Sequence, residues 1–266
     1  MQEANSGLSC PRPSQEGRGT TPALEGWVHS TETFGTADGP GIRYILFLAG
    51  CPLRCQYCHN PDTWHRKDGT LTSVEDILSD IAQYRNFFGR GRGRGGVTIS
   101  GGEPLVQPKF CKSILRGCKE MGLHTALDTS GYLGKDADDE LLADLDLVLL
   151  DIKAATGMKY KSLTNVSLDP TIRFAERLAH LNKPVWLRHV LVPGYTDNVT
   201  DLEALATFAA GLGNVERVDI LPFHQLGEHK WRERGLDYKL AGVRPPAPET
   251  VIKARDIFRA AGLLAY

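Results

Sequence analysis

Short apolar runs alternate with amphipathic segments from residue 43 onward, and this alternation restricts the possible folds more than any other feature of the chain. Strands are expected at Arg43–Ala49, Val97–Ser100, His124–Asp128, Leu145–Ile152, Val185–Val192 and Val215–Leu221. Helices are expected at 74–84, Pro108–Met121, Asp138–Asp144, Thr171–Leu181, Asp201–Leu212 and Glu249–Ala261. The near-continuous apolar run Leu147-Val148-Leu149-Leu150 is typical of a parallel strand covered by helices. The pattern therefore predicts an α/β fold in which six strand–helix repeats form an incomplete barrel.

The first of these helices has a recognisable start. Thr72-Ser73-Val74-Glu75 has the spacing of a capping box, in which the Thr72 side chain accepts a backbone hydrogen bond and Glu75 reaches back. Apolar side chains then share one helix face, at Val74, Ile77, Leu78, Ile81 and Tyr84. We expect this face to pack against the sheet, because such a stripe is the usual contact surface of a helix on a core.

Length and charge exclude some classes of protein. With 266 residues, the chain could form one large domain or two small ones. Its 31 basic and 32 acidic residues nearly balance, so neither nucleic acid nor a membrane surface is an expected partner. The chain has no run of 18 or more apolar residues, so no membrane span is expected.

The N-terminal segment differs in composition from the remainder. Residues 1–24 lack the basic start and apolar stretch of a secretory signal and contain many Ser, Gly, Pro and Gln residues. We expect them to form a disordered extension before one domain at residues 25–266. Six cysteines, clustered rather than spread, favour a reducing cytoplasm over a disulfide scaffold.

Three cysteines follow the first expected strand as a C-x-x-x-C-x-x-C run, at Cys51, Cys55 and Cys58. Thiolates are soft ligands that select zinc, copper(I) or iron–sulfur clusters. A cubane cluster has four irons, so ligation by three cysteines would leave one iron open to bind and activate a small molecule. The run therefore points to cluster chemistry on a substrate or cosubstrate.

A structural zinc site is the alternative interpretation of the same cysteines. Structural zinc takes four protein ligands, usually from two separated pairs. His59 directly follows Cys58, and adjacent side chains rarely reach one tetrahedral ion without backbone strain. Cys111 and Cys118 lie on one face of an expected helix and are predicted core residues. The spacing alone thus favours a cluster over zinc.

Several further motifs share their order with one known family. They are Thr36-Ala37-Asp38-Gly39-Pro40-Gly41-Ile42-Arg43, Cys58-His59-Asn60-Pro61-Asp62-Thr63-Trp64, Ser100-Gly101-Gly102-Glu103, Leu127-Asp128-Thr129-Ser130-Gly131, Leu150-Asp151-Ile152-Lys153, Val192-Pro193-Gly194 and Leu221-Pro222-Phe223-His224-Gln225-Leu226-Gly227. Together with the cysteine run, they resemble the pyruvate formate-lyase activating enzymes of the radical S-adenosylmethionine (SAM) superfamily. The resemblance extends in unbroken order from residue 25 to the C-terminus, so one accidental motif does not explain it.

The resemblance implies a partial (β/α)6 barrel with three bound groups: a 4Fe-4S cluster, SAM and a monovalent cation, sodium or potassium. Cys51, Cys55 and Cys58 would ligate the cluster. Residues at family positions that contact SAM are Tyr57, Asn60, Gly101, Gly102, Glu103, Lys153, Arg188 and His224. The cation would be bound by Asp128, Thr129, Asp151 and the backbone carbonyl of Leu149, and Asp38 would lie near a docked substrate peptide.

The expected topology offers a check on these assignments. In barrels of alternating strands and helices, active groups lie at the carboxyl ends of the strands. The implied site residues follow the ends of expected strands, as Cys51, Gly101, Asp128, Asp151 and His224 illustrate. We therefore expect them to project from different strands onto one face.

The implied activity is the installation of a glycyl radical in a partner protein after reductive cleavage of SAM. Pyruvate formate-lyase is the implied protein substrate, flavodoxin or ferredoxin the implied electron donor, and the protein is expected to be monomeric. Activases of other glycyl radical enzymes often carry extra cysteine clusters between the cysteine run and the Gly-Gly-Glu motif. No cysteine lies between Cys58 and Gly101, which favours the pyruvate formate-lyase type over another activase.

Two other segments have simpler interpretations. Arg90, Arg92 and Arg94 alternate with glycine in the 89–96 segment, which a zinc-stabilised RNA-binding module could use, although a flexible loop is favoured. Trp231 and Tyr238 are expected to pack the C-terminal segment on the barrel rather than to contact SAM.

Overall fold

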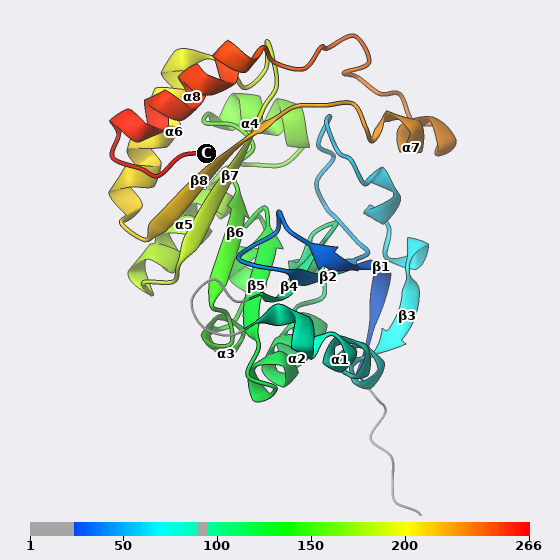
Figure 1. Cartoon of the computed structure of the whole chain (residues 1–266). Coiled ribbons are helices and arrows are strands. Elements are labelled where there is room, and N and C mark those ends of the chain that lie inside the picture. Colours follow the sequence, from blue (N-terminus) through cyan, green and yellow to red (C-terminus); the bar gives the residue numbers. More distant parts are fainter. Residues whose placement is uncertain (1–23, 90–94) are drawn as a thin grey trace, which may run out of the picture.

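One open sheet of eight strands organises the part of the chain that the computed structural model describes, residues 24–89 and 95–266 (Figure 1). The strands are β1 (Glu25–Gly35), β2 (Arg43–Leu48), β3 (Thr70–Ser73), β4 (Gly96–Gly101), β5 (His124–Thr129), β6 (Leu147–Asp151), β7 (Val185–Leu191) and β8 (Val215–Pro222). Their order is β3-β1-β2-β4-β5-β6-β7-β8, with parallel pairing from β2 through β8. The predicted α/β fold with an incomplete barrel is confirmed.

Helices connect the strands, and most of them follow the outer side of the curved sheet (Figure 1). They are α1 (Val74–Gln83), α2 (Pro108–Glu120), α3 (Asp139–Ala143), α4 (Gly157–Thr164), α5 (Asp169–His180), α6 (Val199–Leu212), α7 (Glu228–Glu233) and α8 (Pro248–Ala260). Single turns of 3-10 helix are η1 (Pro61–Thr63), η2 (Arg66–Asp68), η3 (Arg85–Phe88), η4 (Pro104–Val106) and η5 (Gly134–Asp136). All six predicted helices are present, with ends that differ by a few residues, whereas the short helices α4 and α7 were not predicted.

The two remaining strands, β1 and β3, were also not predicted. Both pairings of β1, with β2 and with β3, are antiparallel. Much of β1 is polar and exposed, as in Ser30-Thr31-Glu32, so it lacks the apolar signal of a covered strand. β3 has only four residues. These strands form the antiparallel edge of an otherwise parallel sheet.

Helix α1 begins one residue later than the capping box suggested. Its N-cap is Ser73, whose side chain accepts a hydrogen bond from the Asp76 amide at 3.1 Å. Thr72 lies within β3, opposite Gly26, and its hydroxyl donates to the Thr70 carbonyl at 3.2 Å instead. The predicted apolar face is present, since Ile77 and Ile81 are buried.

The core has two parts, on the two faces of the sheet. The larger part joins the outer face to the helices and includes Cys111 and Cys118, both fully buried as predicted. The smaller part fills the inner face beneath the barrel mouth, with Ala126, Leu147 and Leu149 packed against Trp186. The carboxyl ends of these strands therefore lie above a packed apolar layer.

Two expectations concern segments at the limits of the described chain. The proposed N-terminal extension (except Leu24) and the arginines of the Arg-Gly segment lie outside the described residues. Within the described ranges, the longest apolar helices are too short or too polar to cross a membrane.

Candidate active site

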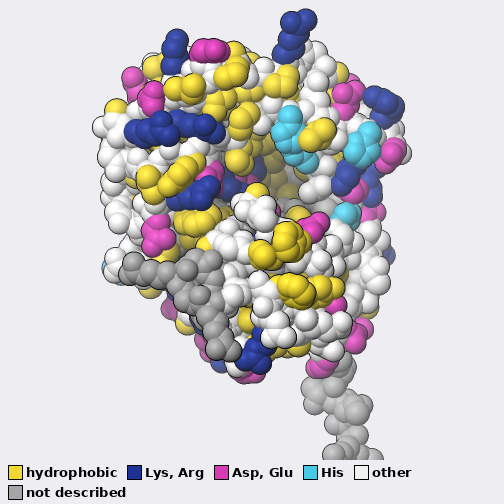
Figure 2. Space-filling model, in the orientation of Figure 1, with side chains coloured by type: hydrophobic (Ala, Val, Ile, Leu, Met, Phe, Trp, Pro, Cys, Tyr) yellow, Lys and Arg dark blue, Asp and Glu magenta, His cyan; other side chains and the backbone are white. Residues whose placement is uncertain are grey.

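A cavity of about 460 Å³ opens at the carboxyl ends of the parallel strands. Its walls come from the loop after β2 and from the ends of β4, β5, β6, β7 and β8, as expected from the topology. Fourteen of the predicted site residues line it: Asp38, Cys51, Cys55, Tyr57, Cys58, Asn60, Gly101, Gly102, Asp128, Thr129, Asp151, Lys153, Arg188 and His224. Figure 2 shows a hollow near the middle of this face. Its volume lies in the range of small-molecule sites.

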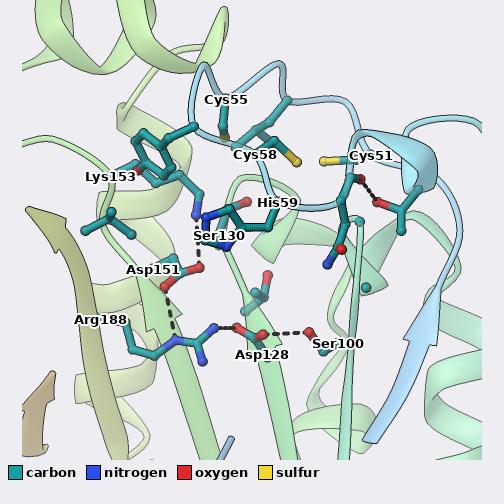
Figure 3. A pocket seen from close by; sticks show the side chains of 18 of the residues that line it. Cys51, Cys55, Cys58, His59, Ser100, Asp128, Ser130, Asp151, Lys153 and Arg188 are labelled. Carbon is teal, nitrogen blue, oxygen red and sulfur yellow. Dashed lines mark hydrogen bonds and ion pairs between the residues drawn. The ribbon is translucent and has the colours of Figure 1, made fainter. Parts of the chain in front are cut away.

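The three cysteines lie together at one side of the cavity, on the loop that follows β2 (Figure 3). All three are free thiols, and Figure 3 shows the sulfurs of Cys51 and Cys58 pointing toward one another. Burial raises the pKa of each thiol, that of Cys55 to about 12. Binding of a metal to these thiols must therefore release protons.

The geometry of the cysteines differs from that of a mononuclear site. In the described ranges, no three His, Cys, Asp or Glu side chains converge closely enough to hold a single metal ion. A cubane cluster does not need such convergence, because each cysteine binds a different iron. The donor set of three soft thiols around one cavity therefore fits a cluster.

An aromatic stack supports the cysteine loop from the C-terminal segment. Trp231, on α7, donates a hydrogen bond from Nε1 to the Cys58 carbonyl at 2.8 Å. Its ring meets Trp64 edge-on, with centroids 5.1 Å apart, and lies 5.4 Å from the Tyr238 ring. The Arg54 guanidinium covers the Trp64 ring at 4.7 Å. The prediction that Trp231 and Tyr238 pack the C-terminal segment is confirmed.

Gly101 and Gly102 let the end of β4 approach the cysteine loop closely. Gly101 has φ +130°, and a Cβ atom there would lie 2.2 Å from the Leu48 backbone. A Cβ atom on Gly102 would lie 2.4 Å from the Gly50 carbonyl oxygen. Side chains at these two positions would therefore push the two loops apart.

The side chain of Glu103 has its own hydrogen-bond partners. Its carboxylate is buried outside the cavity lining and accepts hydrogen bonds from Thr129 Oγ1 at 2.6 Å and from the Ser130 amide at 2.9 Å. It also accepts from the Ser130 hydroxyl and the Leu105 amide. Burial raises the pKa of Glu103, and these donors oppose the rise. These hydrogen bonds hold the segment after β5, and the contact of Glu103 with SAM stays a prediction.

Charged side chains from three neighbouring strands form a linked group (Figure 3). Arg188, on β7, contacts Asp128 Oδ1 at 2.5 Å, Asp151 Oδ1 at 3.1 Å and Asp38 Oδ1 at 3.2 Å. Lys153 binds the other oxygen of Asp151 at 2.9 Å. Parallel pairing explains the proximity, because Asp151 lies opposite Arg188 in the β6–β7 ladder.

This group carries more negative than positive charge. Asp38, Asp128 and Asp151 contribute three carboxylates, against the two cations of Arg188 and Lys153. Burial raises the pKa of Asp128 to about 6, although Arg188 opposes it. At Asp151 burial acts in the same direction, but Arg188 and Lys153 outweigh it and lower the pKa to about 2. Both pKa values lie below 7, so Asp128 and Asp151 are mainly ionised at neutral pH.

Two expected cation ligands lie beside this group. Thr129 lines the cavity, and its hydroxyl accepts a hydrogen bond from the Gly131 amide at 2.9 Å. Leu149 lies opposite Asp128 in the β5–β6 ladder, but its side chain belongs to the inner core and does not line the cavity. Only the backbone of Leu149 could face a ligand, as predicted from the sequence.

Ring and polar side chains from the cysteine loop and from the segment after β8 form another part of the lining. The rings of His59 and His224 stack with centroids 4.2 Å apart, and His59 Nε2 lies 3.1 Å from the His224 carbonyl. Asn60 accepts a hydrogen bond from Lys230 at 2.8 Å. The buried hydroxyl of Tyr57 has no hydrogen-bond partner among the described residues. This wall thus offers flat surfaces and an unused polar atom to a ligand.

Four polar lining residues were not among the predicted contacts: Thr63 and, next to predicted residues, the three residues Ser100, His59 and Ser130. Ser100 donates a hydrogen bond to Asp128 Oδ2 at 2.6 Å, so it helps to fix that carboxylate. Each of the three directly adjoins a predicted residue in the sequence. That adjacency was the signal that could have found them.

Comparisons with known proteins place this site in a family. The family model described as "Radical SAM superfamily" matches residues 45–208. The "Pyruvate formate-lyase 1-activating enzyme" of Escherichia coli strain K12 is 44% identical over 239 residues, which cover 89% of this chain and 96% of the relative. The "Pyruvate formate-lyase-activating enzyme" of Staphylococcus epidermidis is 45% identical over 238 residues, covering 87% and 94%.

Solved structures agree with this result. A domain of a pyruvate-formate lyase-activating enzyme from Bacteroides vulgatus superposes with a TM-score of 0.55 at 27% identity, covering 65% of this chain and 98% of that one. Streptococcus suis SuiB, at 15% identity, shares the fold with a TM-score of 0.63 over 86% of this chain and 49% of its own. The chain therefore belongs to the radical SAM superfamily and, within it, to the family of the pyruvate formate-lyase-activating enzymes.

Proposed function

We propose that the protein activates pyruvate formate-lyase under anaerobic conditions by generating a glycyl radical in it. The observation that carries the proposal is one cavity that joins three free cysteines to residues at the ends of five parallel strands. The identity of 44% over nearly the full length of a relative named for this activity supports the choice of partner. Membership of the superfamily implies a 4Fe-4S cluster and SAM.

Cys51, Cys55 and Cys58 are the residues that would hold the cluster, and the fourth iron is left for SAM. When bound, the reduced cluster would supply the one electron that cleaves SAM to methionine and a 5′-deoxyadenosyl radical, and this radical would take a hydrogen atom from the Cα of a partner glycine to give 5′-deoxyadenosine. The protein itself would bind and orient the cluster and SAM and would exclude water from them, as is usual where a cofactor carries the chemistry. An external one-electron donor, flavodoxin or ferredoxin, must reach the site.

We assign the two ends of SAM to different parts of the cavity lining. Gly101 and Gly102 expose backbone beside the cysteine loop, where the amino group of the methionine half can be bound. Tyr57 and Asn60, on the cysteine loop itself, and the His224 ring after β8 suit the nucleoside. Lys153 Nζ lies 5.9 Å from the centre of the Tyr57 ring and can approach a carboxylate of the ligand.

A monovalent cation suits the space beside Asp128 and Asp151. The surplus carboxylate charge described above favours a cation, and hard oxygen ligands are what sodium and potassium prefer. Its ligands would be the two carboxylates, Thr129 and the Leu149 carbonyl. Such an ion would also neutralise the carboxylate of SAM.

Glu103 has a supporting part in this proposal. Its carboxylate holds Thr129 and Ser130 through hydrogen bonds, and Thr129 is one of the proposed cation ligands. Glu103 therefore positions the cation site through its side chain. Its own backbone amide donates to the Gly50 carbonyl at 2.9 Å, which ties it to the cysteine loop.

The partner glycine would enter beside Asp38. The Asp38 carboxylate lines the cavity and is held by Arg188, so the loop that carries it borders the proposed SAM position. A glycine suits the reaction because its Cα is unhindered and its radical is stabilised by the flanking amides. We further propose that the protein acts as a cytoplasmic monomer.

The decisive experiment mixes the anaerobic, reduced protein with SAM and pyruvate formate-lyase and records the electron paramagnetic resonance spectrum. A glycyl doublet that loses its splitting when the partner glycine carries deuterium at Cα is the expected result. Cleavage of SAM without a radical on this partner would instead favour another glycyl radical enzyme as the target.

A further inference from the structure

A second cavity, of about 400 Å³, lies between the turn that follows β5 and helix α5. It is separate from the proposed SAM site, since no residue lines both. Tyr132, Gly134 and Lys135 come from the turn, while Arg173, Phe174 and Arg177 come from the helix. Nothing in the proposed activity uses it.

The charge on the walls of this cavity has one sign. Lys135, Arg173 and Arg177 line it, and no acidic side chain does. Arg177 is already engaged: it donates to the Ala137 carbonyl at 2.7 Å and pairs with Asp139 at 2.5 Å. Within the described ranges, no carboxylate pairs with Lys135 or Arg173. Two cations at the cavity are therefore free to bind an anion.

The apolar floor of the cavity is already formed. The Phe174 ring is only 3% exposed and lies directly against the turn, because a Cβ atom on Gly134 would approach it to 2.2 Å. Arg177 binds the Gly134 carbonyl at 3.3 Å, so helix and turn are held at a fixed distance. A ligand would thus meet a preformed surface, with little ordering to offset its binding.

We propose that this second cavity is a binding site for a small organic anion, a phosphate monoester or a carboxylate that carries an apolar ring. The ring would lie over Phe174 beside the half-buried Tyr132. The anionic group would reach Arg173 and Lys135, whose charge-assisted hydrogen bonds are stronger than neutral ones. An arginine is well suited to both candidate anions, because its fork of donors matches phosphate and carboxylate.

Calorimetric titration of the cluster-loaded protein, saturated with SAM so that the first cavity is filled, tests the proposal. The probes are phenyl phosphate, benzoate, phenol and inorganic phosphate. We expect phenyl phosphate or benzoate to bind with a stoichiometry of one and at least about tenfold more tightly than phenol or inorganic phosphate. Whichever of the two binds more tightly identifies the anionic group.

The variants are Arg173→Ala and, as a matched control, Lys253→Ala, an exposed helical cation of α8 far from this lining. Arg173→Ala should weaken binding of the preferred probe by about tenfold, and Lys253→Ala by less than about twofold. Arg173 is exposed, so thermal unfolding of its variant should match the parent. Failure of both ring-bearing anions to bind, or equal binding by the Arg173 variant, would overturn the proposal.

Discussion

The two cavities described above are close in volume, about 460 and 400 Å³, but they are built in different ways. The first gathers its lining from the cysteine loop and from the ends of five strands, so its residues are far apart in the sequence. The second is made by two short segments, 132–135 and 170–177. The first cavity therefore depends on the whole sheet, whereas the second cavity depends on one turn and one helix.

The electrostatics of the cavities also differ. The first contains a group of three carboxylates and two cations, which suits a zwitterionic ligand accompanied by a cation. The second contains cations alone, which suits an anion. One run of chain nevertheless connects them, because Thr129 and Ser130 line the first cavity and Tyr132 begins the second.

The largest expected effect is the loss of the cluster, which should abolish function at the first cavity and leave the second cavity unaffected. Cys51→Ala, Cys55→Ala or Cys58→Ala should each abolish cluster assembly and SAM cleavage, because each removes a thiolate ligand from the first cavity. Iron and sulfide analysis of anaerobically reconstituted protein, followed by a SAM cleavage assay, measures both losses. Since none of these residues lines the second cavity, probe binding there should persist.

Cys111→Ala and Cys118→Ala are the matched controls. Both residues belong to α2, their thiols are fully buried in the core, and neither lines a cavity described above. Each variant should keep the cluster and lose about 1 kcal/mol of unfolding free energy. If Cys118→Ala lost the cluster as completely as Cys55→Ala does, the assignment of three ligands would be wrong.

The next largest effect concerns the acidic group of the first cavity. Asp128→Asn or Asp151→Asn should weaken SAM binding by about tenfold or more, because each removes a buried charge that faces Arg188 and the proposed cation. The dependence of binding on sodium or potassium should fall as well, with iron content unchanged. Calorimetry of SAM binding with and without these ions checks both.

Asp144→Asn is the matched control for the Asp128 and Asp151 variants. Asp144 is also buried and paired with an arginine, Arg116 at 2.6 Å, but it lines neither cavity. It should leave SAM affinity within about twofold of the parent. Unaltered affinity and ion dependence in both the Asp128 and Asp151 variants would remove these carboxylates from the site.

Much of the first cavity could be predicted because its residues follow strand ends, and strand ends can be recognised in the sequence. Cys51, Gly101, Asp128, Asp151 and His224 each follow an apolar run, and parallel pairing brings such ends to one edge. The strands β1 and β3 escaped prediction because their stability comes from pairing with neighbours and not from an apolar pattern of their own.

The position of Glu103 shows a different limit. Its motif indicated proximity to SAM, and its neighbours Gly101 and Gly102 do line the cavity. The direction of its side chain depends on which donors lie nearest after folding, and these are supplied by Thr129 and Ser130 on another strand end. The second cavity was missed for a similar reason, since Arg173 and Lys135 belong to no motif.

Glu103→Ala should have an intermediate effect on stability, which can be measured in the cluster-free protein. It leaves the Thr129 hydroxyl and the Ser130 amide without their acceptor, which should lower the unfolding free energy by about 3 kcal/mol. Denaturant unfolding of the cluster-free protein measures this loss. Glu140→Ala is the control, because Glu140 is an exposed surface partner of Lys112 and should change stability by less than about 0.5 kcal/mol. If the Glu103→Ala protein kept its stability but bound SAM poorly, Glu103 would instead contact SAM directly.

The smallest expected effect tests whether the two cavities communicate. Thr171, on α5, donates a hydrogen bond to the Ser130 carbonyl at 2.8 Å, so the helix that borders the second cavity also holds a residue of the first. Because this hydrogen bond joins the two linings, saturating phenyl phosphate or benzoate should tighten SAM binding by up to about fivefold, and SAM should tighten binding of that probe by the same factor. Paired calorimetric titrations measure both factors. Thr171→Val removes the hydrogen bond with little change in side-chain size and should reduce the coupling. A bound probe that leaves SAM affinity unchanged would show that the cavities act independently.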